Sequence, residues 1–133
     1  MAATQLVIDT DVVIDHLRKK TGVLKHVLRI YSCAITAINL YELRSVPFLS
    51  DHQRNSLEEV LQITKVIPFN QNAAERAAEI WNTLRASGQL IGAQDVQIAG
   101  ICVANDFPLL TRNKNHFQRV PDLILFASAD FAS

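Results

Sequence analysis

The sequence has only two cysteines, Cys33 and Cys102, and each stands among apolar residues. Their spacing matches no zinc or redox motif, so we expect ordinary reduced thiols rather than a thiolate metal site. No apolar run approaches the length of a membrane-spanning helix, and the first such run is cut by Asp9. Residues 1–5 also lack the basic charge of a secretory signal peptide. We therefore expect a cytoplasmic protein with no membrane segment.

An excess of positive charge is lacking too, because 13 Lys and Arg residues balance 13 Asp and Glu residues. A uniformly basic surface for nucleic acid is therefore excluded, and any contact with RNA or DNA must rest on a local cluster of cations. Two stretches contain such clusters, residues 18–29 and residues 112–119. We interpret the first as an ordinary solvated surface and consider the second as a candidate RNA contact below.

What the chain does have is a regular alternation of short apolar stretches and helical patterns. Hydrophobic residues make up 49% of the 133 residues, enough for the core of one domain, which we expect to span residues 1–133. The apolar stretches predict strands at residues 5–8, 32–36, 66–69, 109–111 and 123–126. Helical spacing follows Asp11 and recurs at residues 23–30, 37–46, 51–64, 72–87 and 93–105. This alternation predicts an α/β fold, a three-layer α/β/α sandwich around a mostly parallel, twisted sheet.

Two carboxylates, Asp9 and Asp11, stand where the first strand gives way to a helix. The carboxyl ends of parallel strands open into the crevice where α/β proteins bind ligands, which favours a functional site here. The alternative is structural, with Asp11 as the helix N-cap and Asp9 as a polar strand end. In the helix that follows, Val13 and Leu17 belong to the apolar face, and Asp15 is expected outside it.

Two further acids fall on helix faces that are otherwise apolar. Glu42 lies between Ile38 and Val46 at four-residue spacing, and Asp95 begins a helix, residues 93–105, that is apolar nearly all round. A carboxylate on a core-facing stripe is costly unless it is paired or bound to a cation. Glu42 has an alternative, since it reaches solvent if it lies at the edge of its stripe. For Asp95, the helix N-terminus contributes only about 0.3–1 kcal/mol, so a metal or a dense hydrogen-bond site is the better explanation.

Asp9, Glu42 and Asp95, with Asn113 after a later strand, form a set of oxygen ligands. Such a set suits Mg²⁺ or Mn²⁺ better than zinc. Several carboxylates at close range repel one another and take up protons unless a cation neutralises them. Mg²⁺ held by a few carboxylates is the usual arrangement for phosphoryl transfer, so these residues predict metal-dependent cleavage of a phosphodiester.

Four segments in order along the chain carry a resemblance to a known family: VIDTDVVIDHL, TAINLYEL, IGAQDVQIAGICVAND and PLLTRNKNHFQRVPDL. The chain resembles a PIN-domain endoribonuclease, specifically the VapC-type toxin of a toxin–antitoxin pair. The resemblance covers nearly the whole length. It implies a PIN-like fold, Mg²⁺- or Mn²⁺-dependent hydrolysis of RNA, a homodimer, and inhibition by a small cognate antitoxin.

The resemblance also implies roles for particular residues. Asp9, Glu42 and Asp95 match the three acidic metal ligands of the family; Asn113 falls where the fourth ligand is Asp or Asn; Asp11 falls where many members have Asn or Ser; and Thr111 matches a hydroxyl near the site.

Arg112 and Lys114 directly follow the strand predicted at residues 109–111, so we expect them at the rim of the same crevice as Asp9. There their cations would contact phosphates on either side of the scissile bond. In the alternative interpretation, both cations simply pair with nearby surface acids, since exposed ion pairs are frequent.

Two other functions fit parts of the sequence. VIDTD also resembles the start of haloacid-dehalogenase-type phosphatases, in which the first Asp, here Asp9, is the nucleophile. Those enzymes need a later lysine and a paired acidic motif, whereas Lys65 is isolated and no Asp–Asp pair follows Leu110. The chain could also be a non-catalytic PIN-like module that binds RNA or protein. The presence of all three acids in order argues against that function.

Overall fold

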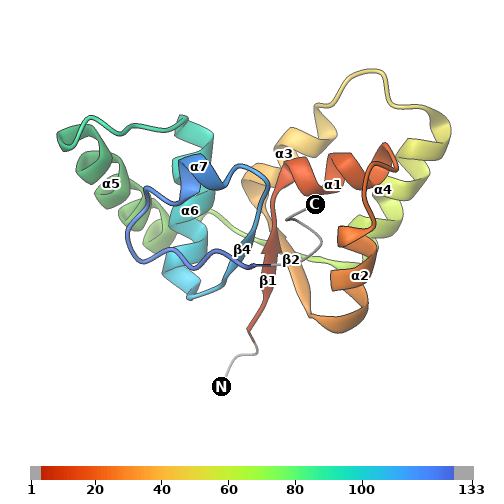
Figure 1. Cartoon of the computed structure of the whole chain (residues 1–133), viewed down its shortest axis with the longest axis horizontal. Coiled ribbons are helices and arrows are strands. Elements are labelled where there is room, and N and C mark those ends of the chain that lie inside the picture. The colour runs from red at the N-terminus through yellow and green to blue at the C-terminus, as the bar shows by residue number, and fades with distance from the viewer. Residues whose placement is uncertain (1–3, 128–133) are drawn as a thin grey trace.

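The computed structural model describes residues 4–127, and its centre is a four-stranded parallel sheet (Figure 1). The strands are β1 (Leu6–Ile8), β2 (Cys33–Thr36), β3 (Lys65–Ile67) and β4 (Leu109–Leu110), in the order β3-β2-β1-β4. Val7 of β1 pairs with Ala34 on one side and with Leu109 on the other. Strands β1 and β2 are buried at every residue, which is why both read as continuous apolar runs.

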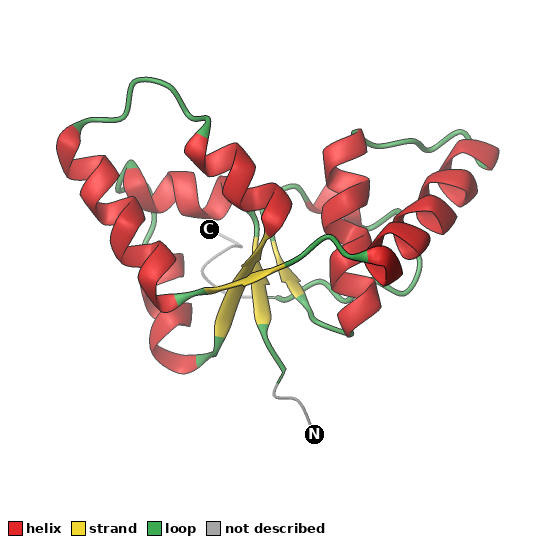
Figure 2. Cartoon of the chain, turned by 180° about the vertical axis from the view of Figure 1, so that it is seen from behind, coloured by secondary structure: helices red, strands yellow, loops and turns green. Residues whose placement is uncertain are grey.

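Seven helices are found in the described part of the chain: α1 (Thr10–Leu17), α2 (Val23–Ile30), α3 (Ala37–Arg44), α4 (Asp51–Ile63), α5 (Gln71–Ala86), α6 (Ala93–Asn105) and α7 (Lys114–Phe117). Helices α1, α2 and α4 cover one face of the sheet, and α5 and α6 cover the other (Figures 1 and 2). The predicted three-layer α/β/α sandwich is therefore confirmed. No helix within residues 4–127 is both long and apolar enough to cross a membrane.

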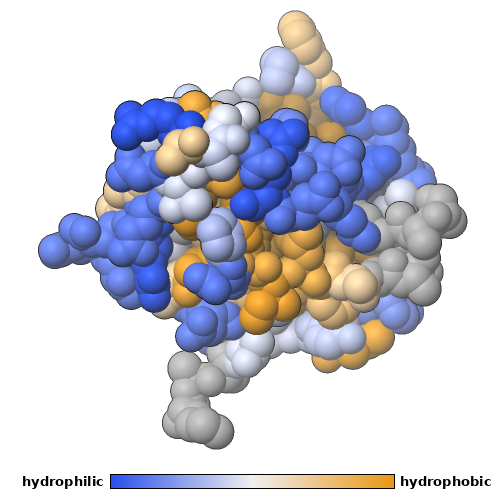
Figure 3. All heavy atoms as spheres, turned by 60° about the vertical axis from the view of Figure 1, so that its left-hand side comes forward, coloured by the Kyte–Doolittle hydropathy of each residue, from blue (hydrophilic) through white to orange (hydrophobic). Residues whose placement is uncertain are grey.

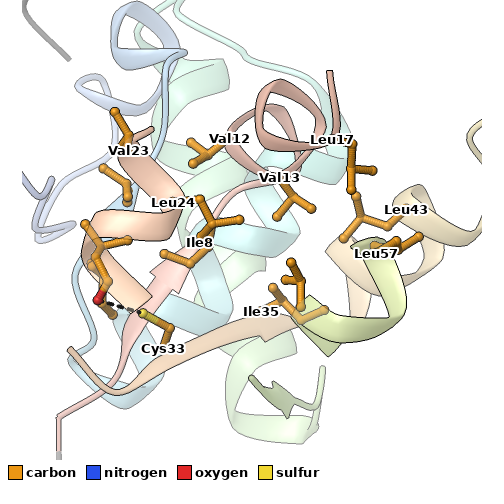
Figure 4. Packing of buried hydrophobic residues seen from close by; sticks show 14 residues of the cluster. Ile8, Val12, Val13, Leu17, Val23, Leu24, Cys33, Ile35, Leu43 and Leu57 are labelled. Carbon is orange, nitrogen blue, oxygen red and sulfur yellow. Dashed lines mark hydrogen bonds between the residues drawn. The ribbon is translucent and has the colours of Figure 1, made fainter. Parts of the chain in front are cut away.

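Strand β1 divides its side chains between two hydrophobic cores. Leu6 and Ile8 pack with α1, α2 and α4, and Figure 4 shows Ile8 in this first core beside Val12 and Leu24. Val7 points to the opposite face and packs with α5 and α6. This alternation follows from the two-residue period of a strand. It fixes the orientation of the next residue, Asp9, at the carboxyl end of β1.

Helix α3 lies at the carboxyl edge of the sheet, between the two layers. Leu43 packs into the first core, while Ile38 packs against the second. Helix α6 is held close to α5 because Gly100 has no side chain; a Cβ there would lie 2.8 Å from the Ala73 carbonyl oxygen. The outer side of the α5 layer is mainly hydrophilic, with hydrophobic residues visible between the polar ones (Figure 3).

Several predicted boundaries are wrong in detail. Helix α3 ends at Arg44, and α5 begins earlier than predicted because Asn70, rather than Asn72, accepts the hydrogen bond of the Ala73 amide. The strand predicted at 123–126 is a single parallel bridge between Leu109 and Leu125. The short helix α7 was not predicted at all. Strand β3 is an edge strand, as Pro68 indicates.

Candidate functional site

Asp9 is held at the carboxyl end of β1 by hydrogen bonds from three elements. Its Oδ1 accepts from the Thr10 amide at 2.8 Å and from Asn39 Nδ2 at 3.2 Å. Its Oδ2 accepts from the Thr111 hydroxyl at 2.7 Å. Asp9, and not Asp11, is the N-cap of α1. The structural alternative is therefore wrong about which acid caps the helix, and the cap is also the most buried of the predicted ligands, at 6% exposure.

The surroundings of Asp9 disfavour its charge. Burial, and then the neighbouring Asp11 carboxylate, raise the pKa of Asp9 to about 7, against the opposing effect of the Thr111 and Thr10 hydrogen bonds. Asp95 is near enough to add to this rise. Burial raises the pKa of Asp11 as well. The hydrogen bonds to Asp9 therefore do not offset the burial and the neighbouring carboxylate that raise its pKa.

Asn39 is a site residue that the sequence interpretation missed. It is fully buried at the start of α3, and its Oδ1 accepts from the Thr36 amide and hydroxyl at 2.9 and 2.7 Å. Its Nδ2 donates to Asp9 and, at 3.0 Å, to the Thr10 hydroxyl. The signal was present, because a polar Asn three residues after Thr36 completes a capping box.

Glu42 joins this network through Thr10, whose hydroxyl donates to Glu42 Oε1 at 2.6 Å. The predicted stripe of Ile38, Glu42 and Val46 is not continuous, because α3 ends at Arg44 and Val46 lies beyond it. The buried residues of α3 are Asn39 and Leu43, and Glu42 itself is half-buried beside them. Glu42 is therefore linked to Asp9 through Thr10, as its predicted position near Asp9 requires, but it is not placed there by a stripe that includes Val46.

Asp95 lies in the first turn of α6, where its side chain is 26% exposed and its Oδ2 is 3.7 Å from Nδ1 of His116. Burial raises the pKa of Asp95, and the adjacent His116 opposes this rise. Asn113 approaches the same histidine, with its Nδ2 2.9 Å from His116 Nδ1. His116 thus lies between two predicted site residues, and from the sequence alone it was assigned only to the basic cluster.

Asp11 and Arg112 are joined across the site. The Arg112 amide donates to the two carboxylate oxygens of Asp11 at 3.3 and 3.4 Å. The Arg112 guanidinium forms an ion pair with Asp15, whose side chain is only 9% exposed. Asp15, which was expected outside the apolar face, is nevertheless buried. Lys114, the other predicted RNA contact, is exposed at the start of α7.

The donor chemistry of this edge fits a hard divalent cation. Asp9, Asp11, Glu42 and Asp95 offer carboxylate oxygens alone, the ligand type preferred by Mg²⁺ and Mn²⁺. The pKa values of Asp9, Asp11 and Asp95 are raised, so a bound cation would favour their charged forms. Within residues 4–127, however, no three Asp, Glu, His or Cys side chains are arranged around one metal position. Glu42 instead accepts from the Thr10 hydroxyl, and Asp95 lies beside His116.

A comparison with protein-family models matches residues 6–123 to the PIN domain. The chain belongs to the PIN domain family. This match spans all four strands and the site described above.

Individual relatives of this PIN domain are named ribonucleases. The chain is 26% identical over 123 residues to Ribonuclease VapC1 of Methanocaldococcus jannaschii, covering 90% of this chain and 83% of the relative. It is 30% identical over 95 residues to Ribonuclease VapC2 of Rickettsia felis, covering 69% of this chain and 71% of that protein. Its fold resembles the crystal structure of VapBC2 from Rickettsia felis bound to a promoter DNA fragment. That match has a TM-score of 0.80 and 24% identity, over 92% of this chain and 98% of the other.

Proposed function

We propose that this PIN domain is a VapC-type endoribonuclease, which hydrolyses RNA phosphodiester bonds with Mg²⁺ or Mn²⁺ and acts as the toxin of a toxin–antitoxin pair. The observation that carries the proposal is the Asp9 carboxylate, buried and fixed by donors from α1, α3 and the end of β4, with Glu42 and Asp95 beside it. Relatives named Ribonuclease VapC support RNA as the substrate.

The residues around Asp9 explain how such a site would work. The Thr111 hydroxyl and the Thr10 amide lower the pKa of Asp9 against burial, and so favour the anion that a cation needs as a ligand. Asn39 fixes the rotation of the same carboxylate. A bound Mg²⁺ would supply Lewis-acid activation of the phosphodiester and neutralise the charge that develops on it. Glu42 would complete the anionic ligand set.

We further propose that Asn113 and Asp95 form the opposite side of this ligand set. Both face His116, which contacts Asn113 through the amide nitrogen Nδ2 and lies 3.7 Å from Oδ2 of Asp95. Asn113 is neutral and contributes an oxygen without charge, which would make this side a weaker cation site than one with a fourth acid.

The phosphatase alternative lacks support at the same edge. A nucleophilic Asp needs a lysine near it, and Lys65 is the first residue of the edge strand β3. By the strand register Lys65 is level with Val7, two residues before Asp9, and β2 lies between β3 and β1.

The proposed protein partners are a small antitoxin and a second copy of the chain. The VapBC complex that resembles this fold supports the antitoxin, which would present an arginine to the acidic edge, because guanidinium pairs bidentately with carboxylate. For the homodimer, the candidate surface is the apolar groove between α5 and α6 that includes Phe69, Trp81 and Val96. Lys114 is our candidate for contact with RNA phosphates.

The test combines a cellular and a purified assay. The chain alone, its Asp9→Asn variant, and the chain with its neighbouring gene product are expressed in bacteria, and both ends of cleaved RNA are mapped. We expect growth arrest and discrete cleavage sites for the parent chain only. Purified protein should cut the mapped RNA in Mg²⁺ and stop in EDTA. Equal cleavage by Asp9→Asn, or cleavage that persists in EDTA, would contradict the proposal.

A further inference from the structure

The segment that links β4 to α7, residues 111–113, carries the predicted site residues Thr111 and Asn113 and the predicted RNA contact Arg112, and it belongs to no helix or strand. Thr111 directs its hydroxyl to Asp9, and the Asn113 amide donates to the Thr111 hydroxyl oxygen at 3.0 Å. The orientation of both residues therefore depends on how this segment is held against α1. Arg112, between them, makes contacts to α1 with both its backbone and its side chain.

Those contacts are arranged one helical turn apart. Asp11 and Asp15 are four residues apart on α1, so their side chains lie on the same face of the helix. Asp11 accepts the Arg112 amide, and Asp15 pairs with the Arg112 guanidinium. Two separate groups of one residue are thus bound by two successive turns of α1, which fixes both the position and the direction of the segment.

The burial of the two partners differs. Asp15 is 9% exposed, whereas the side chain of Arg112 is 52% exposed. Within residues 4–127, the Arg112 guanidinium is the one partner seen for the Asp15 carboxylate. If Arg112 turned to a phosphate, it would leave a buried carboxylate without a counter-charge, which is strongly unfavourable. The geometry therefore opposes the prediction that Arg112 is primarily an RNA contact.

We propose that Arg112 is a positioning residue that the buried Asp15 holds in place, and that this pair aligns Thr111 and Asn113 with Asp9. The inference rests on the proposed function for its catalytic consequence, but the ordering of the segment is a property of the free protein. It also gives Asp11 a role as the acceptor of the Arg112 amide.

The test is a double-mutant cycle with Asp15→Asn, Arg112→Gln and the double variant. The first readout is amide hydrogen exchange of Arg112 and Asn113, measured by NMR in EDTA. Each single variant should speed this exchange about tenfold, and the double variant should add little, because both changes remove the same interaction. Arg112→Lys keeps a cation beside Asp15 and should retain much of the protection. Glu58→Gln breaks the exposed Arg44–Glu58 pair and is the matched control, with exchange unchanged.

RNA binding and RNA cleavage are measured separately on the same variants. RNA binding in Ca²⁺ should stay within about twofold for every variant, while kcat for cleavage in Mg²⁺ falls about tenfold in each single variant and no further in the double. Unchanged exchange in Asp15→Asn would overturn the proposal. The proposal would also be overturned if Arg112→Gln weakened RNA binding both in the parent and in the Asp15→Asn background while Asp15→Asn alone bound RNA normally, because that result identifies a phosphate contact.

If Asp15→Asn does not fold, the comparison of Arg112→Lys with Arg112→Gln decides. Stronger protection of the Arg112 and Asn113 amides in Arg112→Lys than in Arg112→Gln supports the pairing with Asp15, and equal protection refutes it. A parent chain that cuts no RNA would refute the proposed function and leave the exchange result standing.

Discussion

Asp9→Asn tests the electrostatics of the site most directly. The native pKa of about 7 lies above the ordinary value of 3.8, so between those pH values folded Asp9 keeps a proton that the unfolded chain has released. Since the native state then binds more protons, the free energy of unfolding falls as the pH rises from about 4 to about 7. The side chain introduced by Asp9→Asn has no carboxyl proton to release in this pH range. Its amide can donate to the Thr111 oxygen while its carbonyl accepts from Thr10 and Asn39.

The magnitude follows from the shift itself. A change from 3.8 to about 7 corresponds to roughly 4 kcal/mol of unfavourable free energy for the charged form, and relaxation of neighbouring groups reduces it, so we expect about 2–4 kcal/mol. Below pH 4 the variant should lack this advantage, because Asp9 is then protonated in both states. Above pH 7 the variant should be more stable than the parent by the full amount.

The assay is urea unfolding of metal-free protein from pH 4 to pH 8.5. Asp106→Asn, an exposed change of the same chemical kind at the end of α6, is the control. Mg²⁺ at 100 times its dissociation constant should stabilise the parent at pH 8 by about 2.7 kcal/mol, and Asp9→Asn much less. If the difference between variant and parent is the same at pH 4.5 and pH 8, Asp9 is ionised throughout and the reasoning is wrong.

Other predictions concern neighbouring residues and partners. Glu42→Gln and Asp95→Asn should each nearly abolish RNA cleavage with the fold intact by circular dichroism, and parental rates in either variant would remove that residue from the site. Asn39→Ala should lower the free energy of urea unfolding by about 2–4 kcal/mol, because it leaves buried partners unsatisfied; a loss below about 0.5 kcal/mol, typical of a surface change, would contradict this. Lys114→Ala should weaken binding of every RNA tested in Ca²⁺, with a salt slope shallower by roughly 0.7; an unchanged slope would exclude a phosphate contact. Sedimentation at micromolar concentration should show a homodimer, and a monomer would count against it.

The sequence by itself determined the layers of the fold and the edge that carries the acids. The short apolar run of β1, ended by Asp9, favours a strand buried on both faces, and such strands occur in parallel sheets covered by helices. Because β1 is followed at once by Asp9, and α6 begins just before Asp95, local pattern was enough to predict these two acids near one edge. Periodicity carries this information because it shows which face of a single element is apolar and therefore packs toward the core.

Tertiary structure alone decided how the site is held together. Asn39 reaches Asp9 across 30 residues, and Arg112 reaches Asp15 across 97. Asp15 stands outside the apolar face in the helical pattern, yet it is buried and pairs with a guanidinium from the segment after β4. Hydrogen bonds and ion pairs of this kind depend on strand register and on how a helix is rotated against its neighbour. Hydrophobic periodicity does not encode those quantities, because many packings bury the same apolar faces while only one of them joins these polar groups.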